Sequence, residues 1–477
     1  MRFYISILTN IYILLDSEHT QPKLGDEMND QKNRKGDADN KVEQNSRRKF
    51  LEHGLSLTAA AGISPSLLIS TDLKAQTNPL TPWGWPTPYQ KISEKSVAWL
   101  KSKGWWPLQI AWNPLWSEGN IILFLMRQQK LMEKRGIDVE YTPFLAASLM
   151  NEVYMPGRVQ IAQAGSLGLL QVIDRKIPTA AIACYPTQRQ AFLCPKDSPL
   201  KNSLSELKGA KVLGRPAVVG VTIGSTTHLA FLIAVKVYGL EEGKDYILKN
   251  TPPADIITMP KGIDVVGIWE PNVILMDEFL KNARIFDLIN NYQIFNGYSY
   301  IRGEIEENAP DVIQAYADSF MEAQLYARYK PQEAIADFAN DPSQRGRDPK
   351  LIERDVQIHV LNPKPTRNYV FEDVGGLWIP LELYQAGIMT DAGVLKRKYT
   401  EADFKSVLRP KYLAETFNRL GWAIPKRPSF MPVNWPGKIG QPPYPPYGVM
   451  EMGKQNFPGP GDLVRPWTFA GKTYKPT

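Results

Sequence analysis

The sequence predicts an α/β protein of two lobes, each built on a mostly parallel sheet flanked by helices. Short apolar runs typical of strands alternate with longer apolar or amphipathic runs typical of helices. This alternation is typical of βαβ units, in which helices cover both faces of a parallel sheet. Two such series are joined by the crossover at 190–209, so we expect two lobes with a cleft between them.

The first series forms the first lobe in this interpretation. Its expected strands and helices alternate along the chain: strands at 107–112, 137–144, 158–165 and 178–185, and helices at 119–136, 148–154 and 166–177. The helix at 119–136 should end at Gly136, because glycine is the commonest residue just beyond a helix C-terminus.

The second series forms the second lobe. Its expected strands lie at 210–214, 245–250 and 263–269, and its helices at 225–239 and 271–280. The helix at 225–239 begins at Ser225 and ends at Gly239, which agrees with the residue preferences of the two helix ends. We expect the chain to continue in further helices over 341–424, for example at 401–421.

The last segment, 425–477, is rich in proline and aromatic residues and has neither a helix nor a strand period. This composition predicts an extended tail. Its many aromatic side chains favour a tail that wraps over the protein's own surface, and an arm that docks a partner is the alternative.

The N-terminal segment resembles an export signal. Ser46-Arg47-Arg48-Lys49-Phe50-Leu51 precedes a weakly apolar run and the small residue Ala75, the layout of a twin-arginine leader. The alternative is a basic start to an ordinary amphipathic helix. An earlier apolar run at 3–15 is shorter than the roughly 20 residues that a spanning helix needs. Met28 is a second possible start of translation.

Composition narrows the classes of partner. The formal net charge is +7, and basic residues are scattered without a run or an aromatic-interleaved patch. This pattern argues against a nucleic-acid partner and suggests a preference for small anions. Histidines and cysteines show no metal-ligand spacing, so we expect no metal and no cofactor.

Cys184 and Cys194 are the chain's cysteines, and they flank a strand, a turn and a second strand. If the two strands form a hairpin, Cys184 lies opposite residue 191 and not opposite Cys194. Two buried small side chains are therefore favoured, and a disulfide is left open.

Several blocks together resemble the substrate-binding proteins of ABC importers of the nitrate, sulfonate and taurine type. The blocks are ILFLMRQQKLMEKRGIDVEYTPF, GRVQIAQAGSLGLLQVIDRKIP, CPKDSPLKNSLSELKGAKV, TIGSTTHLAFLIAVKVYGL and KGIDVVGIWEP. The resemblance covers roughly 105–340 and implies a two-lobed, type II-like periplasmic-binding-protein fold with a hinge. It further implies a periplasmic monomer that captures a small anionic solute between its lobes and delivers it to a membrane permease.

The chain departs from that family in two places. Pro260 interrupts the segment at 256–262, and a long C-terminal extension follows the family core. The expected organisation is a leader at 1–75, an N-terminal arm at 76–104, the first part of lobe 1 at 105–195, lobe 2 at 196–290, a return to lobe 1 plus a helical extension at 291–424, and the tail at 425–477.

The ligand site should lie in the loops after the strands, because ligands of open α/β sheets bind beyond the carboxyl ends of the strands. Ser225, Thr226 and Thr227 open one helix, and Gly165 and Ser166 open another. Helix N-termini present free N–H groups and the positive end of a dipole, which suit an anion. Ordinary helix capping is the alternative, and the family's use of this position favours ligand contact.

Aromatic and acidic residues complete the expected site. Trp112, Trp116 and Trp269 come from the two opposing lobes and could stack on an organic ligand, although a tryptophan near a strand end is more often a core residue. Trp116 is favoured among them because it lies in a loop. Glu270 and Glu118 either pair with nearby Arg or Lys or receive an ammonium group. The expected ligand contacts are Asn113, Trp116, Gly165, Ser166, Tyr185, Ser225, Thr226, Thr227, Trp269 and Glu270.

An enzyme is the alternative function, since the same fold hosts a desulfinase and a pyrimidine synthase. Cys184 at a strand end and His228 at a helix start would form a thiolate and imidazole pair. A lone cysteine on an apolar strand is usually a packing residue, so we expect no catalytic residue and no enzyme.

Overall fold

The computed structural model describes residues 89–113, 117–144, 146–186, 189–356, 377–419, 434–447, 467–469 and 472–474. All described residues belong to one unit, Thr77–Thr477. The expected leader at 1–75, with its arginine pair, lies outside the described residues. In the described part of the chain, no helix combines the length and apolarity needed to cross a bilayer.

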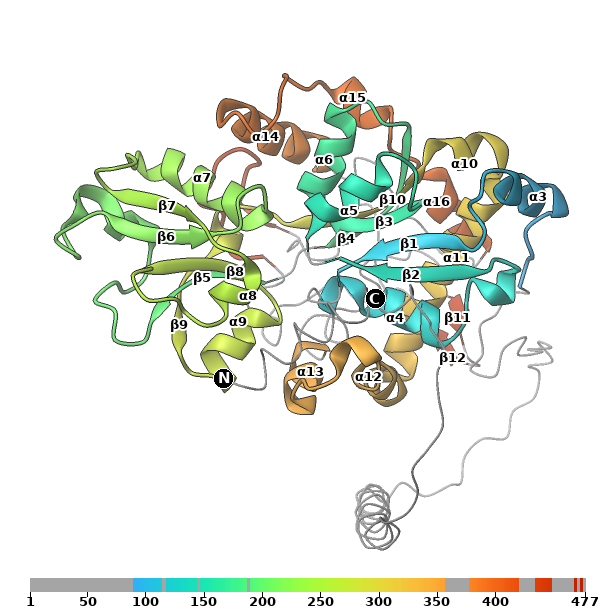
Figure 1. The fold of residues 1–477 in the computed structure, drawn as a ribbon, viewed down its shortest axis with the longest axis horizontal. Coiled ribbons are helices and arrows are strands. Elements are labelled where there is room, and N and C mark those ends of the chain that lie inside the picture. Colours follow the sequence, from blue (N-terminus) through green and yellow to red (C-terminus); the bar gives the residue numbers. More distant parts are fainter. Residues whose placement is uncertain are drawn as a thin grey trace, which may run out of the picture. The chain divides into compact units, whose positions relative to one another are not determined.

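The first lobe contains a sheet in the order β2-β1-β3-β10-β4 (Figure 1). Its strands are β1 (Leu108–Trp112), β2 (Val139–Pro143), β3 (Ile161–Gly165), β4 (Thr179–Pro186) and β10 (Asn296–Arg302). Strand β1 pairs in parallel with β2 and β3, whereas β10 runs antiparallel between β3 and β4.

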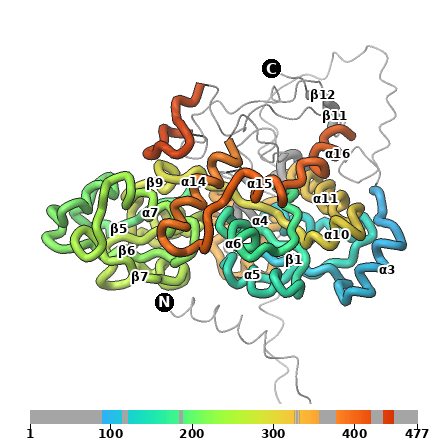
Figure 2. Tube along the Cα trace, turned by 90° about the horizontal axis from the view of Figure 1, so that it is seen from above, coloured from blue at the N-terminus to red at the C-terminus, as the bar shows by residue number. Residues whose placement is uncertain are grey.

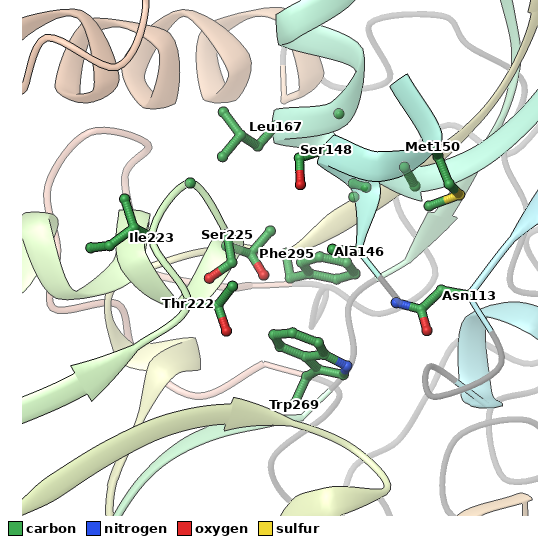
Figure 3. Close-up of a pocket in the computed structure, with 16 residues that line it drawn as sticks. Asn113, Ala146, Ser148, Met150, Leu167, Thr222, Ile223, Ser225, Trp269 and Phe295 are labelled. Atoms are coloured by element: carbon green, nitrogen blue, oxygen red, sulfur yellow. The ribbon is translucent and has the colours of Figure 1, made fainter. Parts of the chain in front are cut away.

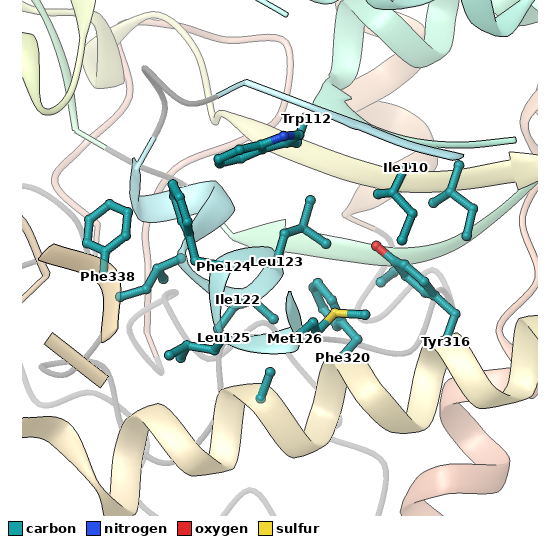
Figure 4. Close-up of a cluster of buried hydrophobic side chains, with 14 of the residues drawn as sticks. Ile110, Trp112, Ile122, Leu123, Phe124, Leu125, Met126, Tyr316, Phe320 and Phe338 are labelled. Carbon is teal, nitrogen blue, oxygen red and sulfur yellow. The ribbon is translucent and has the colours of Figure 1, made fainter. Parts of the chain in front are cut away.

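Helices cover both faces of this sheet, and successive residues of β1 point to opposite faces. Ile110 and Trp112 pack with helices α4 (Ser117–Gln128) and α11 (Pro310–Tyr329), as Figure 4 shows. Ala111 packs on the other face with α5 (Ala147–Tyr154) and α6 (Ser166–Asp174). This double burial explains why β1 is apolar except at Gln109.

The second lobe contains a sheet in the order β7-β6-β8-β5-β9. Its strands are β5 (Gln190–Pro195), β6 (Ala217–Val221), β7 (Tyr246–Asn250), β8 (Val265–Trp269) and β9 (Ala283–Leu288). Strand β6 pairs in parallel with β7 and β8, and β5 runs antiparallel between β8 and β9. The helical segments are η2 (Leu204–Ala210), α7 (Thr226–Tyr238), α8 (Pro253–Ile256), α9 (Asn272–Ile274) and the π-helical turn η3 (Leu275–Phe279).

The two sheets share one topology, with a single antiparallel strand in the fourth position. In each sheet the antiparallel strand is the first strand along the chain after the chain crosses from the other lobe. Strand β5 follows β4, and β10 follows β9 and the turn η4 (Ile289–Asn291). The expected two-lobed α/β periplasmic-binding-protein fold is confirmed. We call the segment 289–296, which returns the chain to the first lobe, the hinge segment.

Several expected elements differ in position. The strand expected at 210–214 is wrong: Ala210 and Gly214 both have positive φ, which breaks an extended run, and the strand forms at 217–221 instead. The helix expected at 119–136 ends at Gln128, and Gly136 closes the separate turn η1 (Glu133–Arg135) with φ +77°.

The expected hairpin around the cysteines is also wrong. Strands β4 and β5 follow each other in the chain but belong to different sheets, so they do not pair. Cys194 is buried and its thiol is free, which excludes the disulfide with Cys184 in this structure. Strand β5, which the expected boundary at 195 places in lobe 1, hydrogen-bonds within the sheet of lobe 2.

The C-terminal extension is helical and contacts both lobes. It contains α12 (Pro331–Ala339), α13 (Pro349–Val356), α14 (Trp378–Asp391), α15 (Glu401–Lys405) and α16 (Lys411–Arg419). Helices α12 and α13 pack against α4 of the first lobe, and α14 packs against α7 of the second. Figures 1 and 2 both show α14 between α7 and α6.

Two expectations about this extension need correction. The helix expected at 401–421 is two helices, because Pro410 cannot supply the N–H that a continuous helix requires. No strand was expected beyond 425, yet β11 (Trp467–Phe469) and β12 (Lys472–Tyr474) form an antiparallel pair. In the same tail, the Tyr447 hydroxyl is buried and donates to the carbonyl of Gln293 at 2.7 Å.

A buried ion pair fixes η1 to α11 in the first lobe. Arg135 Nη2 lies 2.7 Å from Glu322 Oε2, and both side chains are at most 2% exposed. The hydroxyl of Tyr89 donates to the other carboxylate oxygen at 2.7 Å. The carboxylate is therefore fully engaged, and removing its charge would leave the guanidinium buried without compensation.

Glu322→Gln should lower the free energy of unfolding by about 3–5 kcal/mol, since it breaks a buried pair while keeping the side chain's size. The matched control is Glu333→Gln, which alters an exposed pair with Lys330 at 3.4 Å and should cost less than about 1 kcal/mol. Urea unfolding followed by tryptophan fluorescence measures both. Equal losses in the two variants would contradict this assignment.

Candidate functional site

A pocket lies beyond the carboxyl ends of β1, β3, β6 and β8 (Figure 3). Its empty volume, with the solvent at its open mouth included, is about 630 Å³. Both lobes contribute to its lining: Asn113, Ala146, Ala147, Ser148, Met150, Ala164, Gly165, Leu167, Gly168, Thr222, Ile223, Gly224, Ser225, Thr226, Trp269 and Phe295.

Three helices begin at this pocket. Helix α5 starts after Ala146 and α6 starts after Gly165, and no side chain caps either N-terminus. Helix α7 starts after Ser225, whose hydroxyl accepts a hydrogen bond from the N–H of His228. The first N–H groups of a helix have no intrahelical acceptor, so the starts of α5 and α6 offer donors and positive dipole ends to the pocket.

Side-chain donors add to these backbone groups. Ser148 and Ser225 bring hydroxyls to the lining. The hydroxyls of Thr222 and Thr226 also lie there, but they donate to the carbonyl of Thr251 at 3.0 Å and to Gln190 Oε1 at 3.4 Å. The indole nitrogen of Trp269 is buried and has no hydrogen-bond partner within the described part of the chain. Figure 3 shows this indole nitrogen on the side of the ring that faces Asn113. None of the lining residues carries a formal charge.

Apolar groups form the remaining wall. Met150, Leu167, Ile223, Phe295 and the Trp269 ring surround the donors with hydrocarbon surface. The pocket can therefore hold a solute with one anionic end and an apolar remainder.

Glycine is required where the two lobes approach each other. A Cβ at Gly165 would lie 3.1 Å from the Phe295 ring and 3.2 Å from the methyl group of Thr226. At Gly168, one turn into α6, a Cβ would lie 2.8 Å from the Cβ of Ala164, closer than side chains tolerate. The small residues thus let the start of α6 approach the second lobe.

The loop before α7 is fixed by its own hydrogen bonds. Gly224 has φ +78°, which favours glycine, and its N–H donates to Nδ1 of His228 at 3.2 Å. The hydroxyls of Ser225 and Thr227 lie 2.9 Å apart. Burial lowers the pKa of His228, so its imidazole is neutral at pH 7 and serves as an acceptor that positions the loop.

The structure brings part of the expected site together. Asn113, Gly165, Ser225, Thr226 and Trp269 all line the pocket. These residues come from both lobes, as expected from their positions in the loops that follow the strands.

Other expected residues lie elsewhere. The Ser166 side chain is buried and donates to Gln385 of α14 at 3.2 Å, and Thr227 is buried beneath the start of α7. Glu270 is buried and is bound by the guanidinium of Arg189 and by the N–H of Ile274 at 2.9 Å. It is therefore a structural carboxylate, because burial and these partners remove it from the pocket lining.

Trp116, the side chain of Tyr185 and the side chain of Cys184 lie outside the described residues. The expected contacts of Trp116 and Tyr185 stay predictions. For the alternative Cys184 and His228 pair, the described half is His228, which is 5% exposed, accepts from Gly224 and is absent from the lining.

Sequence reasoning missed the start of α5 and the ring of Phe295. Ala146 and Ala147 carry no polar side chain, so the helix start has none of the usual capping residues that mark a binding loop. The sequence signal that could have indicated this helix start was the run of small residues after the strand at 137–144. Phe295 could not be found because it lies in the hinge segment, where neither strand nor helix periodicity applies.

Comparison with known proteins finds a match in sequence as well as matches in structure. The taurine-binding periplasmic protein of Escherichia coli (strain K12) is 26% identical over 204 residues, which are 40% of this chain and 58% of that protein. The match thus spans less than two thirds of the relative's length. No model of a known protein family matches the chain.

Solved structures agree on the fold. The periplasmic nitrate-binding protein NrtA from Synechocystis PCC 6803 matches with a TM-score of 0.53 and 15% identity, over 77% of this chain and 95% of that chain. The periplasmic aliphatic sulphonate binding protein SsuA from Escherichia coli matches with a TM-score of 0.52 and 19% identity, over 63% and 91%. At these identities the likeness establishes the periplasmic-binding-protein fold.

Proposed function

We propose that the protein is the solute-binding component of an ABC import system and captures a small anion, of the sulfonate or nitrate class, in the pocket between its lobes. The uncapped starts of α5 and α6, which point N–H groups at one pocket, carry this proposal. The similarity to a taurine-binding periplasmic protein and the fold shared with sulphonate- and nitrate-binding proteins support it.

The anion would be held by dipoles and not by a charged side chain. Backbone N–H groups at α5 and α6 and the hydroxyl of Ser225 donate to its oxygens. Helix N-termini stabilise anions in this way, and the effect is stronger where water is excluded. Such a site binds the anion without an ion pair to a basic side chain. This suits a protein that must release its solute again.

The apolar wall favours an organic sulfonate over a bare inorganic anion. The rings of Trp269 and Phe295 would cover the carbon chain, and the indole N–H would donate to a sulfonate oxygen. Glu270 is bound by Arg189 and Ile274, so this carboxylate does not receive an ammonium group. In this proposal the protein therefore recognises the anionic end of the solute and makes no ion pair with an ammonium group.

The remaining parts of the proposal follow from the same role. The protein works as a periplasmic monomer, delivers its solute to permease subunits in the membrane, and uses no cofactor and no nucleic acid. It performs no chemistry on the solute. Export through the twin-arginine motif at 46–51 brings it to that compartment.

Ala146 offers a direct test, because an acidic residue there should raise the stability of the fold and also weaken anion binding. Ala146→Asp would cap the free N–H groups of α5 and stabilise the fold by about 0.5–2 kcal/mol. It would also remove those donors and place a negative charge at the anion site. We expect affinity to fall at least roughly tenfold to a hundredfold, the worth of a lost hydrogen bond to a charged group.

Isothermal titration calorimetry with methanesulfonate, ethanesulfonate, taurine, nitrate and acetate measures this effect. Ala146→Asn caps the helix without the charge and should give an intermediate affinity. Asn308→Asp adds the same charge on an exposed turn of α10 (Gly303–Asn308) and should bind like the wild type. Unchanged affinity in Ala146→Asp, or no binding of any of these anions by the wild type, would refute the proposed site.

The export proposal predicts that replacing both Arg47 and Arg48 with lysine leaves an uncut precursor in the cytoplasm. The arginine pair is read by the export receptor, and lysine keeps the charge without the guanidinium. Cell fractionation and immunoblotting give the result. Mature protein in the periplasm of cells carrying the double variant would show that another signal directs export.

A further inference from the structure

A cluster of buried polar side chains lies between the hinge segment and α14, next to the pocket residue Phe295. It consists of Gln293, Asn296, Tyr298, Glu382 and Gln385, and each is at most 3% exposed. We call it the hinge polar cluster. Glu382 and Gln385 are one turn apart in α14, so they share a face of that helix.

Hydrogen bonds inside the cluster leave one side-chain oxygen or nitrogen without a partner in the described part of the chain in each cluster residue except Tyr298. Glu382 Oε1 accepts from Asn296 Nδ2 at 2.7 Å and from the Tyr298 hydroxyl at 2.6 Å. Gln385 Oε1 accepts from Gln293 Nε2 at 2.9 Å and from the hydroxyl of Ser166 at 3.2 Å. The cluster therefore joins α14 to the hinge segment, to β10 and to the start of α6.

Three oxygens of the cluster have no hydrogen-bond partner in the described part of the chain: Glu382 Oε2, Gln293 Oε1 and Asn296 Oδ1. Glu382 also forms no ion pair with any described Lys or Arg. A buried carboxylate without a compensating charge is costly, and burial raises the pKa of Glu382 to about 7. Above that pH the cluster carries one negative charge and surplus acceptors.

We propose that the hinge polar cluster binds one hard monovalent cation, of the sodium or potassium class, through Glu382 Oε2 and the amide oxygens of Gln293 and Asn296. Carboxylate and amide oxygens are ligands that hard cations prefer. A single positive charge matches the single carboxylate, whereas a divalent ion would leave a surplus charge buried. The amide nitrogen of Gln385, which also lacks an acceptor in the described part of the chain, would donate to water bound beside the ion.

An ion in this position would connect the C-terminal extension to the hinge segment. Its ligands come from α14, from the hinge segment and from the first residue of β10. Gln385 fixes Ser166 at the first turn of α6, one of the helices that begins at the pocket. The site is thus separate from the anion pocket and lies on the segment that joins the lobes.

Thermal unfolding of the full chain at pH 8 in a choline chloride buffer tests the proposal. Replacing choline by sodium or potassium at constant ionic strength should raise the Tm by about 1–2 °C for each tenfold rise in cation concentration above its Kd. Choline is too large for the site and sets the baseline. Glu382→Gln should abolish the rise, and the exposed Glu333→Gln should keep it.

Equal Tm values in choline, sodium and potassium would overturn the proposal, as would a full response in Glu382→Gln. Because Glu382→Gln removes a buried charge, its Tm in choline should equal or exceed that of the wild type. If this variant does not fold, wild-type crystals grown in rubidium chloride replace it. An anomalous peak beside Glu382 Oε2 supports the site, and a cluster without one refutes it.

Discussion

The parallel pairing of β1 with β2 and β3, and of β6 with β8, is the constraint on which the pocket depends. Parallel strands end at the same edge of a sheet, so the helices that follow must begin there. In the first lobe this brings the starts of α5 and α6 to one place, and in the second it places α7 opposite them. The N–H donors at these helix starts are therefore a property of the topology and need no basic side chain.

The close approach of the lobes at this edge depends on small residues. Gly165 lies close to Phe295 of the hinge segment and to Thr226 of the second lobe. Gly168 lies against Ala164, where a side chain would not fit. Larger side chains would separate the helix starts and weaken their joint action on one anion. The buried pair of Arg189 and Glu270 then fixes the end of β8 that carries Trp269.

Much of the fold could be predicted from sequence because its strands and helices have clear periodicity. The helix that begins after Ser225 and ends at Gly239 was predicted with both ends, since its capping residues are of the preferred types. Strand β6 was misplaced because positive φ at Ala210 and Gly214 is not visible in an apolar pattern. The pairing of β5 with β8 and β9 depends on contacts between distant segments, which local periodicity does not encode.

The candidate site was predicted less completely for related reasons. Thr226 and Trp269 follow strands and could be placed, whereas Ala146 contributes backbone N–H groups that no side chain marks. Ser166 and Glu270 have the right chemistry, but α14 and Arg189 engage them inside the protein. The hinge polar cluster depends on the C-terminal extension meeting the hinge, an arrangement that only the folded chain reveals.

A crystal structure with 2-bromoethanesulfonate tests the central claim most directly, because bromine and sulfonate report on the two ends of the ligand separately. We predict sulfonate oxygens within about 3 Å of the N–H groups at the starts of α5 and α6. The anomalous bromine peak should lie beside the rings of Trp269 and Phe295. A sulfonate bound elsewhere, or bound here through a lysine or arginine side chain with the helix starts unoccupied, would contradict the account.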